Sequence, residues 1–158
     1  NKMGAKLVYF NEKISFGEKI GSLKVVSSNL KNINISKTDI PGLIDELPLI
    51  ALLATQANGI TEVRDAKELR YKECDRIKAI CKNLINMGAN IKELEDGFVI
   101  KGPTLLKAAK IKTYNDHRIA MTFAIAGLVS NEDVELDNPD CVSISFPKFF
   151  QELERLKK

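Results

Sequence analysis

Charged side chains gather at points where the sequence predicts that an apolar helix begins. The pair Asp45-Glu46 precedes the apolar stretch 46–58, which has Pro48 near its start and Gly59 just past its end. Acids favour helix N-termini, so capping alone explains the pair. A carboxylate held against an apolar wall can also act as a general base, and the local sequence leaves both interpretations of Asp45 open.

The second such point is Asn115-Asp116-His117-Arg118, which precedes the apolar stretch 118–129. Asn115 or Asp116 can cap that helix through a side-chain oxygen, with the other side chains simply solvated. In the alternative interpretation, His117 and Arg118 lie at the positive end of the helix, where Arg118 can hold an anion by a two-pronged contact.

A third cluster lies at a predicted strand-to-helix turn, in segment 65–77, which reads DAKELRYKECDRI. A solvated charged surface is the ordinary outcome for such a run. However, Lys72 and Arg76 are four positions apart, so one helical face can present both cations with Glu73 beside them. Cations beside a helix N-terminus suit a phosphate or a carboxylate, so the clusters together predict an anion-binding site.

The elements that must position these clusters occur twice. Met-Gly-Ala stands at 3–5 and at 87–89, and each copy leads through short strand-like segments to an Asp, an apolar helix and another strand. The paired acids are Asp45 and Asp116. Such a repeat indicates a duplicated α/β unit, roughly β-α-β-α-β-β, with apolar helices inside and sheets outside. The second copy lacks its last hairpin, so we expect 1–158 to be a partial domain of a longer protein.

Hydrophobic periodicity and turn residues predict the individual elements. The expected helices cover 46–58, 73–87, 118–129 and the segment from 147 onward. The expected strands cover 6–10, 23–26, 32–35, 60–64, 91–93, 98–101, 110–113 and 134–137, with a turn at Asp96-Gly97. The last helix is expected to bury four apolar side chains, those of Phe149, Phe150, Leu153 and Leu156.

Composition narrows the classes of function. The 158 residues suit one compact domain, and the net charge of +3 arises from 24 basic and 21 acidic residues spread along the chain. This balance argues against nucleic-acid binding but is compatible with a small anionic ligand. Three cysteines without metal or redox spacing and a single histidine, His117, argue against a metal site. Without a signal-peptide pattern or a long apolar run, we expect a cytoplasmic protein with reduced thiols and no membrane segment.

Four strings of the sequence resemble one enzyme family. IDELPLIALLATQANGIT, ELRYKECDRI, NDHRIAM and CVSISFPKFF are similar, in order and spacing, to the C-terminal part of 5-enolpyruvylshikimate-3-phosphate synthase, also called 3-phosphoshikimate 1-carboxyvinyltransferase. The resemblance implies transfer of the enolpyruvyl group of phosphoenolpyruvate to the 5-hydroxyl of shikimate 3-phosphate, with release of phosphate and without a cofactor. This is a step of the shikimate pathway towards chorismate and the aromatic amino acids. The implied fold is an inside-out α/β barrel, of which 1–158 would form about two of the three units of one domain.

The resemblance also implies roles for the charged side chains. Asp45 is expected to contact the shikimate hydroxyls and to accept the proton of the 5-hydroxyl. Glu73 is expected to pass a proton to or from the methylene carbon. The implied substrate contacts are Lys72 at the boundary of the two substrates, Arg76 and Arg118 with phosphoenolpyruvate, and His117 near its phosphate.

The sequence departs from the family pattern at Ile144, where some members carry a lysine that contacts phosphoenolpyruvate; sensitivity to the inhibitor glyphosate is therefore left open. The family's N-terminal lysine, a second-domain arginine and the serines that hold shikimate 3-phosphate lie outside 1–158. We therefore expect the isolated chain to be catalytically inactive and to need the remaining N-terminal part of the same enzyme as its partner.

Two rival functions are kept at this point. UDP-N-acetylglucosamine enolpyruvyl transferase shares the fold and the donor, but it relies on a cysteine in another part of its chain, and the N-D-H-R signature does not belong to it. A non-catalytic α/β interaction module would use the charged clusters only as helix caps. Such a module has no need for Lys72, Arg76 and Arg118 to converge, so convergence of these cations favours an enzyme.

Overall fold

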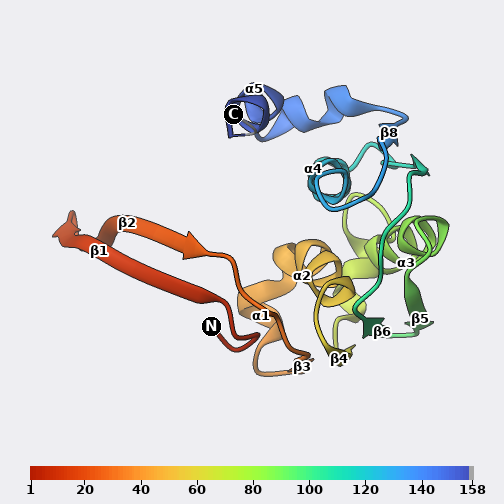
Figure 1. Ribbon diagram of the computed structural model, residues 1–158, viewed down its shortest axis with the longest axis horizontal. Coiled ribbons are helices and arrows are strands. Elements are labelled where there is room, and N and C mark those ends of the chain that lie inside the picture. The colour runs from red at the N-terminus through yellow and green to blue at the C-terminus, as the bar shows by residue number, and fades with distance from the viewer. Residues whose placement is uncertain (157–158) are drawn as a thin grey trace.

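The chain folds into a body of packed helices and strands from which a long two-stranded hairpin projects (Figure 1). The computed structural model describes residues 1–156. The strands are β1 (Lys6–Ser15), β2 (Glu18–Val26), β3 (Asn34–Ile35), β4 (Gly59–Val63), β5 (Asn90–Leu94), β6 (Gly97–Gly102), β7 (Lys110–Ile111) and β8 (Glu135–Leu136). The helices are α1 (Ile40–Leu43), α2 (Leu47–Thr55), α3 (Arg76–Asn86), α4 (His117–Ala126) and α5 (Phe149–Leu156), with 3-10 turns η1 (Ile44–Glu46), η2 (Lys67–Tyr71) and η3 (Pro139–Ile144).

The largest sheet joins strands from both copies of the repeat, in the order β3-β4-β6-β5. β3 runs parallel to β4, whereas β6 is antiparallel to both of its neighbours. The β4–β6 pairing extends from Gly59 opposite Gly102 to Val63 opposite Phe98. The hairpin that opens the second copy therefore completes the sheet of the first copy.

The turn between β5 and β6 lies one residue earlier than the sequence predicted. Glu95 and Asp96 form the turn, and Gly97 is already the first residue of β6. The glycine is required by a close approach of backbone, because a Cβ at Gly97 would lie only 2.0 Å from the carbonyl oxygen of Val63.

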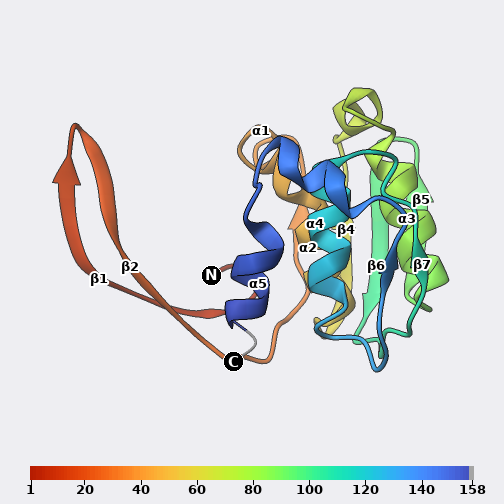
Figure 2. The ribbon, with the colours of Figure 1, turned by 90° about the horizontal axis from the view of Figure 1, so that it is seen from above.

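The apolar helices α2 and α4 lie side by side, between α5 and the main sheet (Figure 2). Six of the nine α2 residues are buried. α3 packs on β5 and buries the face that carries Ile77, Ile80 and Leu84, as its helical spacing predicted. Phe98 of β6 and Phe123 of α4 are the largest apolar side chains of this core. The predicted fold class, with buried helices and outer sheets, is confirmed, and the number of units stays a prediction.

The internal repeat is visible in equivalent backbone hydrogen bonds. The amide of Lys31 donates to the carbonyl of Met3 at 3.0 Å, and the amide of Lys107 donates to that of Met87 at the same distance. The glycine after each methionine has a positive φ, 84° in the first copy and 83° in the second. The parallel pair β7–β8 likewise repeats the parallel pair β3–β4.

The two apolar helices are shorter than the predicted stretches 46–58 and 118–129. After α2, the chain turns into a strand-like pairing in which the amide of Asn58 donates to the carbonyl of Leu30 at 2.9 Å. This long-range pairing follows the end of the helix, where Gln56 and Asn58 also interrupt the apolar run. The predicted strand 32–35 is likewise reduced to two residues, whereas the first hairpin is longer than predicted.

The predicted start of helix 73–87 at Glu73 is wrong. α3 begins at Arg76, because the side chain of Asp75 caps it by accepting the amide of Lys78 at 3.0 Å. Lys72 and Glu73 therefore lie on the loop before the helix and do not share a helical face with Arg76. Convergence of these residues depends on loop conformation rather than on helical spacing.

The prediction that the last helix buries four apolar side chains is also wrong in part. Leu153 is buried and Phe149 is half-buried, whereas Phe150 is 37% exposed and Leu156 is 77% exposed. α5 packs on the rest of the described chain through a narrow stripe around Leu153. Its apolar face is therefore wider than the part of it that the fold buries.

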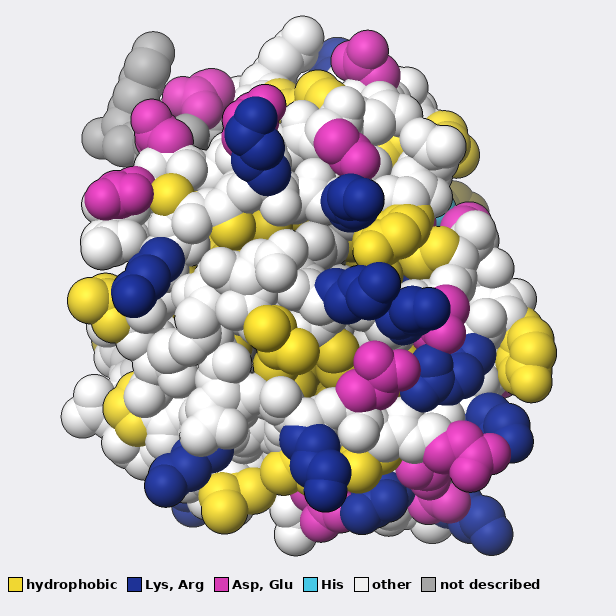
Figure 3. Space-filling model, turned by 90° about the vertical axis from the view of Figure 1, so that its right-hand side faces the viewer, with side chains coloured by type: hydrophobic (Ala, Val, Ile, Leu, Met, Phe, Trp, Pro, Cys, Tyr) yellow, Lys and Arg dark blue, Asp and Glu magenta, His cyan; other side chains and the backbone are white. Residues whose placement is uncertain are grey.

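Positive and negative side chains alternate over the face shown in Figure 3, without a continuous basic stripe across that face. Among residues 1–156, the helices are too short to cross a lipid bilayer. Over the same residues, histidine, cysteine and acidic side chains form no group with the geometry of a metal site.

Candidate active site

The buried ion pair between Arg76 and Asp116 joins the starts of α3 and α4. The Arg76 side chain is 1% exposed, and its Nε donates to Oδ2 of Asp116, itself 0% exposed, at 2.8 Å. Oδ1 of Asp116 accepts the backbone amides of Arg118 at 2.9 Å and Ile119 at 3.3 Å. Asp116 therefore caps α4, as the sequence predicted, and also holds the guanidinium of Arg76, which the sequence did not reveal.

The other nitrogens of Arg76 hold the two candidate acid–base residues. Its Nη1 donates to Oδ1 of Asp45 at 2.8 Å, and its Nη2 donates to Oε2 of Glu73 at 2.6 Å. The side chains of Asp45 and Glu73 are 42% and 47% exposed. One oxygen of each carboxylate is therefore held by the buried guanidinium of Arg76, and the rest of the side chain is open to solvent.

Asp45 faces cations from three segments of the chain. Beyond Arg76, its Oδ1 lies 4.0 Å from Nζ of Lys72, and its Oδ2 lies 3.6 Å from Nη2 of Arg118. Nη1 of Arg118 also donates to Oε1 of Glu46 at 3.0 Å. The two helix starts of the repeat thus contribute side chains to one charged cluster.

His117 completes the cluster as the first residue of α4. Its side chain is 13% exposed, and its Nδ1 lies 4.0 Å from Oε1 of Glu73. The structure brings together all six residues that the sequence singled out: Asp45, Lys72, Glu73, Arg76, His117 and Arg118. Their individual roles stay predictions.

The environment keeps the central charges ionised at neutral pH. Burial would raise the pKa of Asp116, but the hydrogen bond and the charge of Arg76 outweigh burial and lower this pKa below its ordinary value. A hydrogen bond to Glu68 raises the pKa of Lys72, against the smaller effect of burial. Lys72 is therefore positively charged at neutral pH, where an anionic ligand would bind beside it.

Cys74 is a further member of the cluster that the sequence did not predict. Its Sγ lies 3.5 Å from Oδ2 of Asp116 as a hydrogen-bond donor. Burial, followed by the charge of Asp116, raises the pKa of the Cys74 thiol to about 12. A thiol held protonated in this way is a poor nucleophile, so Cys74 belongs to the scaffold of the cluster.

Two pockets bear on how the site is used. One of about 400 Å³ lies beside the cluster, with Asp45, Glu46 and Arg118 on its rim and Leu49 and Phe146 on its walls. Its charged lining is two carboxylates and one guanidinium beside an apolar wall, so of these side chains Arg118 is the one that can bind a small anion.

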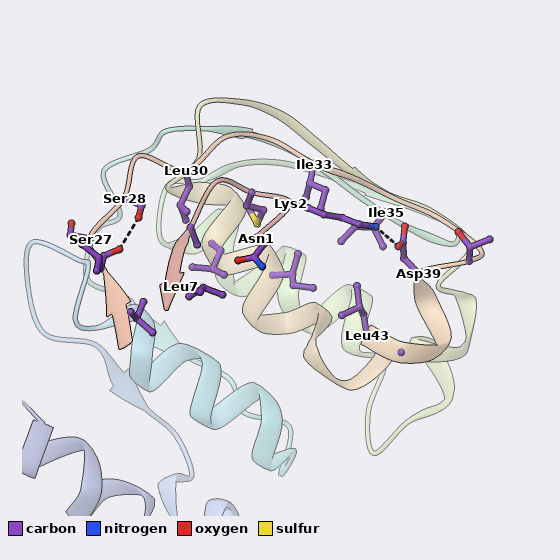
Figure 4. Close-up of a pocket in the computed structure, with 18 residues that line it drawn as sticks. Asn1, Lys2, Leu7, Ser27, Ser28, Leu30, Ile33, Ile35, Asp39 and Leu43 are labelled. Carbon is purple, nitrogen blue, oxygen red and sulfur yellow. Dashed lines mark hydrogen bonds and ion pairs between the residues drawn. The ribbon is translucent and has the colours of Figure 1, made fainter. Parts of the chain in front are cut away.

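The larger pocket, of about 850 Å³, lies where the β1–β2 hairpin leaves the body (Figure 4). Apolar side chains such as Leu7, Leu30 and Leu43 line it. Its edge carries one ion pair, in which Nζ of Lys2 lies 2.7 Å from Oδ1 of Asp39. Such a lining suits packing against another apolar surface better than proton transfer.

Comparisons with known proteins agree on one family. The sequence model of EPSP synthase (3-phosphoshikimate 1-carboxyvinyltransferase) matches residues 1–153. A 3-phosphoshikimate 1-carboxyvinyltransferase of Oceanobacillus iheyensis is 48% identical over 157 residues, which are 99% of this chain and 37% of that protein. One from Streptococcus pyogenes serotype M12 is 53% identical over 156 residues, 98% of this chain and 36% of that protein.

Solved structures show the same relationship. EPSP synthase from Acinetobacter baumannii superposes with a TM-score of 0.91 at 35% identity, over 98% of this chain and 36% of that one. The enolpyruvyl transferase NikO from Streptomyces tendae superposes with a TM-score of 0.67 over 98% of this chain and 33% of that one, and at 19% identity it shows the fold alone. The chain spans about 36% of the length of its Acinetobacter structural relative, and it belongs to the EPSP synthase family.

Proposed function

We propose that residues 1–158 are part of an enzyme that transfers the enolpyruvyl group of phosphoenolpyruvate to the 5-hydroxyl of shikimate 3-phosphate. Phosphate is the other product. The observation that carries this proposal is the convergence of Arg76, Lys72 and Arg118 around the carboxylate of Asp45, from both copies of the repeat. Helix caps in an interaction module do not require such convergence, and family membership supports the same assignment.

The chemistry of an addition followed by an elimination assigns a task to each side chain. Asp45 takes the proton of the 5-hydroxyl as the hydroxyl oxygen attacks C2 of phosphoenolpyruvate, and Glu73, which enters this step protonated, gives its proton to the methylene carbon. The resulting tetrahedral intermediate then loses a methyl proton to Glu73, and the bond to the phosphate oxygen breaks. Both carboxylates are anchored on Arg76, which fixes their spacing.

The cations stabilise the negative charges of the donor. Arg118 lies at the rim of the smaller pocket, where its two-pronged head can hold the carboxylate or the phosphate of phosphoenolpyruvate. Arg76 and Lys72 add fixed positive charge beside it, and His117 lies at the positive start of α4 near the departing phosphate. These contacts use side chains only, without a metal or another cofactor.

The partner that we propose is the N-terminal part of the same enzyme. Counting back equally from the equivalent Lys31 and Lys107, positions 22–26 of β2 correspond to 98–102 of β6. β6 pairs with β4 on one edge and β5 on the other, whereas within 1–156 β2 pairs only with β1. The outer edge of β2 and the larger pocket below it are therefore the surfaces that the rest of the protein covers, and without it the chain is inactive.

We place the enzyme in the cytoplasm, with neither a nucleic acid nor a membrane among its partners. The three thiols are free in the described structure, and Cys81 and Cys141 are buried among apolar groups. Free thiols persist in a reducing compartment, which supports this placement.

The decisive experiment measures phosphate release from phosphoenolpyruvate and shikimate 3-phosphate by the full-length protein that carries residues 1–158. Arg118→Ala is expected to raise KM for phosphoenolpyruvate at least about tenfold, because a charge-assisted two-pronged contact is lost. Lys110→Met is the matched control, because Lys110 is an exposed cation paired only with Glu135 at 3.4 Å. An Arg118→Ala enzyme with unchanged KM would contradict the assignment of Arg118.

The same assay tests the rival acceptor. Replacing shikimate 3-phosphate by UDP-N-acetylglucosamine is expected to abolish phosphate release. Release with the nucleotide sugar alone would instead assign the chain to the rival transferase. If the folded protein releases no phosphate with either acceptor, this result would favour a non-catalytic module.

A further inference from the structure

Among residues 1–156, Arg70 is a strongly bound cation near the cluster that the proposed chemistry does not use. It closes the turn η2, and its side chain is only 20% exposed. Its Nε donates to the carbonyl of Glu95 and one Nη2 proton to that of Leu94, both at 2.7 Å. These carbonyls belong to the end of β5 and the β5–β6 turn, remote in sequence from the loop that carries Lys72 and Glu73.

The other contacts of Arg70 reach the start of α3. Its Nη1 donates to Oδ2 of Asp75 at 2.7 Å, while Oδ1 of Asp75 caps α3 by accepting the amide of Lys78 at 3.0 Å. A second bond from Nη2 reaches Oε1 of Glu93 at 3.0 Å. One guanidinium therefore links the end of η2, the cap of α3 and the β5–β6 hairpin.

The segment between these anchors carries the catalytic loop. Lys72, Glu73 and Cys74 lie between Arg70 and Asp75, outside any helix or strand. A loop of this kind lacks the hydrogen bonds of a regular element, so such crosslinks define its conformation together with the bonds of Glu73 to Arg76 and of Lys72 to Glu68. Arg70 supplies several donors in a fixed fork, which a lysine cannot reproduce.

We infer that Arg70 is a positioning residue that sets where Lys72 and Glu73 stand relative to Asp45, through its bonds to Asp75 and to the β5–β6 turn. The inference rests on the proposed function. Its effect falls on Glu73 and Lys72 rather than on Arg76, because the Arg76 guanidinium is held independently by Asp116 and Asp45. Loss of Arg70 should therefore lower kcat while largely sparing KM for phosphoenolpyruvate.

The test uses the full-length protein that carries these residues, with R70M, R70K and K67M. Met keeps an unbranched apolar stem without the donors, and kcat is expected to fall roughly 10- to 100-fold from misplacement of Glu73, with KM for phosphoenolpyruvate within about threefold. R70K keeps the charge without the fork, so it should resemble R70M more than the parent. K67M is the matched control: Lys67 also contacts the β5–β6 turn, through an exposed 2.7 Å ion pair with Glu95, and its loss should leave kcat unchanged.

Hydrogen exchange provides a second readout that does not depend on activity. Amides 71–75 should exchange faster in R70M than in the parent, whereas the amides of α4 should not change. A folded R70M enzyme with parental kcat, or one whose loss lies wholly in KM, would overturn the inference. Should R70M fail to fold, E93A removes the bond from Nη2 of Arg70 to Glu93, and parental kcat together with parental exchange at 71–75 would overturn it there.

The test of Arg70 and the test of the proposed function can fail independently of each other. An inactive parent protein would contradict the proposed function, and the exchange rates of 71–75 would still decide whether Arg70 holds the loop. An active parent with an R70M variant indistinguishable from it would keep the function and reject the role of Arg70.

Discussion

At the scale of the residue, Arg76 depends on a fully buried acid. Asp116 alone contacts the guanidinium from inside the protein, while Asp45 and Glu73 contact it from the solvent side. The sequence predicted Asp116 as a helix cap from its position before an apolar stretch. It could not predict the ion pair, because 40 residues separate Arg76 from Asp116 and both are buried only after α3 and α4 pack.

Removing the buried acid leaves a buried cation unpaired. Asp116→Ala is expected to lower the free energy of unfolding by about 3–5 kcal/mol, because the charge of Arg76 then lacks its inner partner. Asp116→Asn should cost less, since its amide oxygen can still cap α4. Urea denaturation measures both, and equal losses in the two variants would show that the cap contributes nothing beyond the ion pair.

The same pair makes stability depend on acidic pH. The pKa of Asp116 is lower in the folded chain than its ordinary value of about 3.9, because burial, which raises it, is outweighed by Arg76 together with the backbone amides of Arg118 and Ile119. Its contribution to stability is therefore full above about pH 4 and is lost as the pH falls through the folded-state pKa. The urea midpoint of the parent should drop between pH 5 and about pH 3, and Asp116→Asn should reduce that drop. If the urea midpoint of Asp116→Asn falls with pH as that of the parent does, Asp116 is not the cause of the acid sensitivity.

Cys74 gives a prediction at the alkaline end. Its pKa of about 12 means that the native thiol stays protonated at pH 8, whereas an unfolded thiol has a pKa of about 8.5. Thiol reagents should therefore label Cys74 far more slowly in the native chain than in urea, as mass spectrometry of the labelled peptide can show. Equal rates in both states would mean that the thiol is neither buried nor held by Asp116.

At the scale of the element, local sequence signals predicted where the helices lie, but they predicted the first and last residues of the helices less well. Periodicity identified the buried face of α3, but Glu73 resembled a good first-turn residue, whereas the true cap is Asp75. Asp75 caps α3 by accepting the amide of Lys78, and its other oxygen accepts Arg70, which also binds the β5–β6 hairpin more than 20 residues away in sequence. The β5–β6 turn was correct to one residue, and its glycine is explained by the neighbouring strand rather than by the turn.

Two glycine substitutions test that explanation. Gly97→Ala is expected to destabilise the fold by about 1–3 kcal/mol, because the new Cβ meets the backbone of Val63 and the strands must separate. Gly42→Ala is the matched control within α1, where a Cβ meets no atom within 4 Å and should stabilise by about 0.5–1 kcal/mol. Thermal unfolding of both variants measures the difference, and equal effects would contradict the close approach.

At the scale of the whole molecule, the repeat was readable in the sequence, yet the pairing between its copies was not. Met-Gly-Ala marked the register of the two copies, whereas the order β3-β4-β6-β5 arises only when the second hairpin closes on the first unit. The exposed Leu23 and Val25 of β2 and Leu53 of α2 mark where the corresponding closure is missing within the described residues. Their exposure is explained by the proposed N-terminal partner and has no counterpart in local sequence.

The missing closure predicts a change on assembly. When the N-terminal part of the protein is added, amides within 22–26 should become protected from hydrogen exchange as the edge of β2 gains a strand. Amides within 98–102 already pair on both edges and serve as the internal control. An active mixture in which 22–26 exchanges as fast as before would place the partner elsewhere.

The sheet shared between the copies also bears on how such a protein could have arisen. Among the described residues, the hairpin β5–β6 of the second copy completes the sheet that β3–β4 begins in the first copy. A lone ancestral unit would have exposed both a bare strand edge and an unclaimed hairpin, a state that favours exchange between identical copies. Gene duplication would then have tied together a ring that already existed as an oligomer, so mutual dependence of the units would be older than the single chain.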